Sequence, residues 1–221
     1  MRLTAFRYGT TEISERMAFQ DGDENIKLPI SLMFFLIECK GKKILVDVGC
    51  DTMPGFELCE FEEPVKLLES YGVKRTEITD IVITHAHHDH IDAIRHYMGA
   101  AVFIHENEKK AAEEYLHSHK VKYIFEDSKP LCDGAEFRRI GGHSPGSGIV
   151  LISEKDRTLV LCGDECYTRE NLLLGKPTGC SCDVEKSTSF VKEYAKDCYI
   201  PVLFHDPLLV EGLGYKVLID E

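Results

Sequence analysis

The sequence predicts a layered α/β protein in which two β-sheets lie between helices. Short runs rich in β-branched and aromatic residues alternate with stretches that carry apolar residues at helical spacing. The second half of the chain, beyond about residue 120, repeats the first half's order of strands followed by a helix. This order suits two sheets covered by helices better than one doubly wound sheet.

Each element is predicted from its local pattern. The segments 31–39 and 43–48 are apolar strands joined by Lys40-Gly41-Lys42, which is typical of a hairpin turn. The other predicted strands are short apolar runs at 78–84, 101–104, 136–140, 148–153, 158–162, 200–204 and 215–219. The predicted helices are 62–71, which Gly72 ends, and 89–98, 107–117 and 184–196.

Length and charge limit the domain number and the partners. The chain has 221 residues, which predicts one domain over 1–221. Its formal net charge of −12 disfavours a nucleic-acid partner, because a negative field repels phosphate. No apolar run approaches the ~18 residues of a membrane-spanning helix, and the first residues lack the apolar core of a signal peptide. We therefore expect a cytoplasmic protein that does not bind membranes.

Nine cysteines are present, which is many for this length. A reducing compartment keeps such side chains as thiols. We expect most of them to be small buried side chains, because free cysteine is among the most buried residue types.

One segment carries most of the chemistry. Residues 84–90 read Thr-His-Ala-His-His-Asp-His and place His85, His87, Asp89 and His90 within six residues. The segment follows an apolar strand and precedes a predicted helix, so it lies on a loop at a strand's end. In extended chain His85 and His87 point to the same side, and the next two side chains turn towards a neighbouring point. Imidazole and carboxylate are ligands of zinc, iron and manganese, so this loop can serve two adjacent metal ions.

Three residues downstream can complete such a site. His143 lies in a Gly- and Pro-rich turn between predicted strands, Asp164 follows a strand through Gly163, and His205 follows another strand. A lone histidine after a strand is usually structural, but three ligand types at the ends of successive strands are hard to assign to packing.

The order His85-x-His87-x-Asp89-His90, then His143, Asp164 and His205, resembles the metallo-β-lactamase superfamily over nearly the whole chain. The segment 44–49 is similar to an early strand of that family. The segments 164–171 and 204–206 resemble its N-acyl-homoserine-lactone lactonase branch. The resemblance implies a four-layer αββα fold with metals at the sheet edge.

The resemblance also implies a ligand set and a reaction. One metal ion would be held by His85, His87 and His143, and a second by the set Asp89, His90 and His205, with Asp164 and a hydroxide bridging the two. The ions would be divalent, zinc first, with iron or manganese as alternatives. The hydroxide would attack the carbonyl of a small-molecule ester or lactone.

The resemblance also gives roles to two further residues and a second role to Asp89. Tyr167 would donate a hydrogen bond to the carbonyl oxygen, and Asp89 would carry a proton to the leaving alkoxide. Asp47 would orient a ligand histidine. Tyr167 also has a simpler interpretation as an aromatic residue that packs on its loop.

The sequence departs from the lactonase pattern in places. Ser147 stands where lactonases commonly carry histidine, Glu165 and Cys166 replace smaller residues, and the loop 171–183 differs. Two alternatives on the same scaffold therefore stay open, namely an iron-dependent thiol dioxygenase or other oxidoreductase and a glyoxalase-type thioesterase. A non-catalytic metal-binding protein is a third, and the sequence does not predict the oligomeric state.

Overall fold

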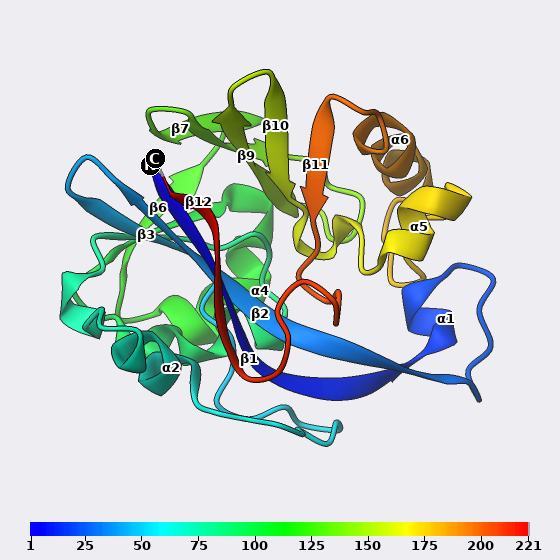
Figure 1. Cartoon of the computed structure of the whole chain (residues 1–221), viewed down its shortest axis with the longest axis horizontal. Coiled ribbons are helices and arrows are strands. Elements are labelled where there is room, and N and C mark those ends of the chain that lie inside the picture. Colours follow the sequence, from blue (N-terminus) through cyan, green and yellow to red (C-terminus); the bar gives the residue numbers. More distant parts are fainter. Residues whose placement is uncertain (221) are drawn as a thin grey trace.

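Two β-sheets are stacked face to face in the computed structural model, which describes residues 1–220 (Figure 1). The larger sheet has seven strands in the order β12-β1-β2-β3-β4-β5-β6. Their bounds are β1 Arg2–Ser14, β2 Lys27–Cys39, β3 Lys42–Val46, β4 Asp80–Val82, β5 Ala101–His105, β6 Lys120–Ile124 and β12 Gly214–Asp220. Strands β3 to β6 pair in parallel and the other pairs are antiparallel.

The smaller sheet has five strands in the order β11-β10-β9-β8-β7. Their bounds are β7 Ser128–Cys132, β8 Ala135–Arg139, β9 Gly148–Glu154, β10 Arg157–Leu161 and β11 Tyr199–Val202. Only β10 and β11 pair in parallel among these described strands. Because the carboxyl ends of β4, β10 and β11 open towards the same region, the loops that follow them can build one site.

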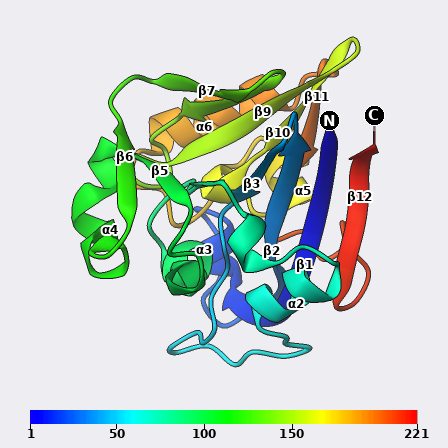
Figure 2. The ribbon, with the colours of Figure 1, turned by 90° about the vertical axis from the view of Figure 1, so that its left-hand side faces the viewer.

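Helices cover the outer faces of both sheets (Figures 1 and 2). The α-helices are α1 Glu15–Ala18, α2 Pro64–Ser70, α3 His88–Ile91, α4 Lys109–Leu116, α5 Arg169–Leu174 and α6 Val184–Tyr194. Short 3-10 helices are η1 Arg75–Glu77, η2 Asp92–His96, η3 Glu106–Glu108 and η4 Gly163–Glu165. The apolar residues of α2, η2 and α4 pack on the larger sheet, and those of α6 pack on the smaller one.

Three apolar cores separate the four layers. Strand β9 shows how its sequence serves two of them: Val150 and Ile152 point into the core between the sheets, while Ile149 and Leu151 pack against α6. In the core between the sheets, the rings of Phe35 and Phe204 lie 4.6 Å apart. The predicted αββα sandwich is therefore confirmed. That residues 1–221 form a single domain stays a prediction.

Several elements were not predicted from the sequence. Strands β1, β6 and β7 and helices α1 and α5 are additional. Strand β1 lies between β2 and β12 and is buried along most of its length, so its sequence shows no polar and apolar alternation (Figure 2). The predicted helix 89–98 is instead the short α3 followed by η2, because the Ala93 N–H bonds to the Gly49 carbonyl rather than along a helix.

The burial of the cysteines differs from the expectation. The nine thiols are free, but the expectation that most are buried is wrong. Four are buried, two are half-buried and three are exposed. The buried four lie in or beside the sheet cores, whereas the exposed three lie in loops; the exposed ones are Cys59, Cys182 and Cys198.

Within residues 1–220 no helix is both long and apolar enough to cross a membrane. The cytoplasmic location stays a prediction.

Candidate metal centre

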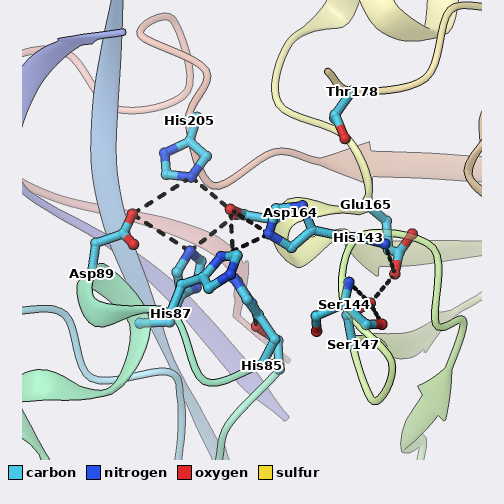
Figure 3. A network of polar contacts seen from close by, with 12 residues as sticks. His85, His87, Asp89, His143, Ser144, Ser147, Asp164, Glu165, Thr178 and His205 are labelled. Carbon is cyan, nitrogen blue, oxygen red and sulfur yellow. Dashed lines mark hydrogen bonds and ion pairs between the residues drawn. The ribbon is translucent and has the colours of Figure 1, made fainter. Parts of the chain in front are cut away.

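The predicted ligands converge at the edge between the two sheets (Figure 3). The larger sheet contributes the loop after β4, with His85 and His87, and the following helix α3, with Asp89 and His90. The smaller sheet contributes the rest: the β8–β9 loop, η4 after β10, and the residues after β11. These three segments carry His143, Asp164 and His205. All seven predicted ligands therefore come together.

The ligand atoms form two clusters. One atom from each of His85, His87, His143 and Asp164 lies within 4.8 Å of the others, and the same holds for a second set of Asp89, His90 and His205. In the first cluster His143 Nε2 lies 2.8 Å from His87 Nδ1. Apart from Asp164, these are the two groups of ligands that the family resemblance assigns to separate ions.

Asp164 lies between the clusters and presents one carboxylate oxygen to each. Its Oδ1 is 3.0 Å from both His90 Nε2 and His205 Nε2. Its Oδ2 is 3.6 Å from His85 Nε2 and 3.4 Å from His143 Nε2. Gly163 makes this placement possible: its φ is +51°, and a Cβ there would lie 3.1 Å from the Gly148 carbonyl oxygen. Asp164 thus presents one carboxylate oxygen to each set of histidines.

Hydrogen bonds fix the rings of three of these histidines from behind. His90 Nδ1 is 2.6 Å from Asp47 Oδ2, and His205 Nδ1 is 2.8 Å from the Ser31 carbonyl oxygen. His85 Nδ1 lies 3.1 Å from Thr84 Oγ1. Each contact leaves Nε2 aimed into the site, as is usual for metal-ligating histidines. The expected role of Asp47 in orienting a ligand histidine agrees with its contact to His90.

The donor set fits divalent metal ions. The buried atom His85 Nε2 has no hydrogen-bond partner among residues 1–220, and Asp164 Oδ2 lies 3.6 Å away from it. A buried nitrogen without a partner is costly, and a cation would satisfy it. Imidazole and carboxylate are ligands of zinc and of its neighbours in the first transition row. The residues present therefore match the group that their spacing predicts.

The electrostatics differ between the two clusters. Burial lowers the pKa of His85 well below its usual value and that of His143 to about 4, so both rings favour the neutral form. Burial alone would also lower the pKa of His90 and His205, but the nearby carboxylates, above all Asp164, raise both. Burial would raise the pKa of Asp164, but the surrounding histidines hold it well below its usual range.

Tyr167 lies beside the clusters and not out in the loop. Its ring centroid is 4.9 Å from that of His205 and 6.0 Å from that of His143. Burial raises the pKa of Tyr167 well above its usual value, and the nearby Asp164 carboxylate raises it further. The hydroxyl is therefore protonated and available as a donor at the site. His88, in contrast, turns away and contacts the Tyr115 hydroxyl and the Thr52 carbonyl.

Sequence reasoning assigned no supporting role to two buried carboxylates that hold these loops, Glu108 and Glu165. Glu108 accepts hydrogen bonds from the Ala86 N–H, the Ser144 hydroxyl and the Gly146 N–H. Glu165 accepts hydrogen bonds from the N–H groups of the segment Gly142-His143. Glu108 follows strand β5 at the same sheet edge, and this position is the sequence signal that could have indicated a residue of the site. The charged residues around it are typical of a solvent-exposed helix, which obscures that signal.

Comparisons with known proteins agree with this geometry. Residues 33–197 match the sequence profile of the metallo-beta-lactamase superfamily. The chain is 25% identical over 227 residues to N-acyl homoserine lactonase AiiB of Agrobacterium fabrum (strain C58 / ATCC 33970). The match covers 82% of this chain and 80% of that protein. It is also 25% identical to the protein of the same name from Rhizobium rhizogenes (strain K84 / ATCC BAA-868), with the same coverage.

Solved structures share the fold. An N-acyl homoserine lactone hydrolase with the product N-hexanoyl-L-homoserine bound at its catalytic metal centre has a TM-score of 0.80 and 23% identity, covering 93% of both chains. AidC, a dizinc quorum-quenching lactonase, has a TM-score of 0.73 and 19% identity, covering 99% of this chain and 94% of that one.

The chain belongs to the metallo-β-lactamase superfamily, whose profile matches most of its length. Its resemblance to the lactonase-like branch of hydrolases is confirmed by these relatives. The findings give no support to the thiol dioxygenase or to the glyoxalase-type thioesterase. Together with the two clusters, they support divalent metal binding.

Proposed function

We propose that the protein is a dinuclear metallohydrolase that opens small-molecule lactones, with N-acyl homoserine lactones as the leading substrate class. The observation that carries this proposal is the position of Asp164, whose two carboxylate oxygens face two separate histidine-containing clusters. Such a shared carboxylate is what a two-ion site requires. A single-ion site would leave the second cluster without a purpose.

In this proposal His85, His87 and His143 would hold one ion, the set Asp89, His90 and His205 would hold the other, and Asp164 would offer one carboxylate oxygen to each. Zinc is the proposed metal, because it is commonly bound by histidine and carboxylate ligands. Bound ions of this kind supply an activated water near neutral pH and polarise an ester carbonyl.

The chain's own groups then handle substrate charge and protons. The Tyr167 hydroxyl is protonated, because burial raises its pKa, so it can donate a hydrogen bond to a carbonyl oxygen that gains negative charge. Asp89 is the more exposed of the two candidate carboxylate ligands, with its side chain 14% exposed against 3% for Asp164. It is therefore the carboxylate best placed to carry a proton to the leaving alkoxide.

The substrate class rests on the relatives. Two curated relatives are named N-acyl homoserine lactonases, and one structural neighbour holds N-hexanoyl-L-homoserine at its metal centre. The net charge of −12 also favours an uncharged small substrate over nucleic acid.

The first experiment counts metal ions per chain by elemental mass spectrometry on protein purified without chelators or nickel resin. We expect about two zinc ions per chain. The same preparation is then assayed on a panel of homoserine lactones of increasing acyl length, with a simple aryl ester as comparison. Two ions together with lactone opening supports the proposal. A single iron ion without hydrolysis contradicts it.

A further inference from the structure

We propose that Glu108 is a positioning residue that holds the three histidines of the first cluster in register. The inference rests on the proposed function, because it concerns how this chain supports one of the two proposed ions. No ligand role is assigned to Glu108 itself. It acts through the two loops that carry His85, His87 and His143.

Glu108 joins these loops directly. It is 2% exposed and ends η3, just after β5. Its Oε2 accepts a hydrogen bond of 3.0 Å from the N–H of Ala86, the residue between His85 and His87. Its Oε1 accepts hydrogen bonds of 2.7 Å from both Ser144 Oγ and the Gly146 N–H, in the loop that carries His143. One carboxylate therefore links both ligand loops.

The second loop is shaped to receive this side chain. A Cβ at Gly146 would lie 2.8 Å from Glu108 Cγ and 3.0 Å from its backbone nitrogen, so only glycine permits the approach. Two of the three donors are backbone N–H groups, so the contact constrains the path of the main chain on each side. A shift of either loop would move its histidine nitrogens relative to those of the other.

The carboxylate is buried without a cationic partner. Among residues 1–220 no ion pair is formed by Glu108, and its hydrogen bonds come only from neutral donors. A buried charge of this kind costs stability compared with an apolar side chain. Its presence at the junction of two ligand loops is explained if it organises the cluster.

The second cluster lacks this support. Of its members, His90 is oriented by Asp47 and His205 by the Ser31 carbonyl, and neither contact involves Glu108. Loss of the Glu108 carboxylate should therefore weaken one ion selectively, whereas a general loss of stability would weaken both. This difference separates a positioning role from a merely structural one.

The test is a zinc titration of the metal-free full chain in competition with a chromophoric chelator. Wild type, Glu108→Gln and the control Glu113→Gln are compared; Glu113 is exposed on α4. The glutamine keeps the size of the side chain but presents an N–H₂ group in place of one acceptor oxygen. We expect one zinc-binding step to weaken by about 10- to 100-fold in Glu108→Gln, with the other step and the control unchanged.

A second variant covers the possibility that Glu108→Gln fails to fold. Ser144→Ala removes one donor to Glu108 and leaves the carboxylate with its two backbone donors. It should weaken the same zinc step by a smaller factor. In the double variant the two effects should not add, because both act through one contact.

The outcomes separate this inference from the proposed function. If wild type binds no zinc, the proposed function fails. If wild type binds two ions but both steps stay unchanged in Glu108→Gln and Ser144→Ala, or both weaken equally, the positioning role is wrong while the proposed function stands.

Discussion

The hydroxyl of Ser147 donates a hydrogen bond to the buried carboxylate of Glu165. These are two of the positions at which the sequence departs from the lactonase pattern, and in the fold they are in direct contact. The same Glu165 oxygen accepts hydrogen bonds from the N–H groups of Gly142 and His143. The two departures therefore form one coupled unit that supports a proposed ligand from behind and leaves the ligand set intact.

Replacing Ser147 with alanine should destabilise the protein by about 1–3 kcal/mol, because a buried carboxylate loses one hydrogen-bond donor. Urea unfolding of the metal-loaded protein measures this change. Ser153→Ala, at an exposed position of β9, is the control and should stay within about 0.5 kcal/mol of wild type. A neutral Ser147→Ala would show that the contact to Glu165 adds no stability.

His87→Ala should abolish metal-dependent lactone opening, with a loss of at least about 100-fold in kcat/KM, because it removes one of the proposed ligands of the first ion. The variant should also bind fewer ions per chain, measured by elemental mass spectrometry. His117→Ala, which changes another exposed histidine, should behave as wild type. Full activity of His87→Ala would remove the proposed site.

Tyr167→Phe should lower kcat on lactones by about 100- to 1000-fold, the range for loss of one donor to a developing oxyanion. Its metal content should stay the same, because the hydroxyl is not among the proposed ligands. Steady-state kinetics and metal analysis on one preparation check both points, with the exposed Tyr215→Phe as control. Unchanged kinetics would favour the packing interpretation of Tyr167.

The metal-free protein should be most stable near pH 6.5, the ordinary pKa of histidine. The raised pKa of His90 and His205 stabilises the fold fully below that pH, and this contribution is lost as the pH rises through the raised values. The lowered pKa of His85 and His143 acts in the opposite direction. There the unfolded chain takes up protons first, so stability falls as the pH drops from 6.5 towards 4.

Denaturant unfolding from pH 5 to 9, with and without chelator, tests this prediction. Metal-loaded protein should show a flatter profile, because ions in place of protons suppress these titrations. A chelator-treated sample that gains stability steadily from pH 6.5 to 9 would contradict the assigned charges of His90 and His205.

The candidate site was largely predictable from the sequence because four of its ligands occur in one compact motif. Of the other three, Asp164 and His205 follow apolar strands, and His143 lies in a Gly- and Pro-rich turn between two strands. No such pattern marks Glu108. It stands in the run Glu106-Asn107-Glu108-Lys109-Lys110, which is typical of a solvated helix. Only the tertiary fold shows that this one carboxylate of the run is buried.

Strand β1 shows the same limit for the fold. It contains Arg7, Tyr8 and several threonines, which do not indicate a buried strand. Arg7 is buried because Glu60 and the Val210 carbonyl, both remote in sequence, accept its hydrogen bonds. Long-range partners of this kind cannot be inferred from local periodicity.

Each proposed ion takes ligands from both sheets: His85 and His87 on one side meet His143 on the other, and His90 meets His205. A bound ion would therefore link the two sheets of the sandwich where their loops meet. The affinity for metal and the stability of the contact between the two sheets would then be coupled, so selection on either would alter both. Catalysis would start only once the two sheets had docked, so turnover would itself report that the chain had finished folding.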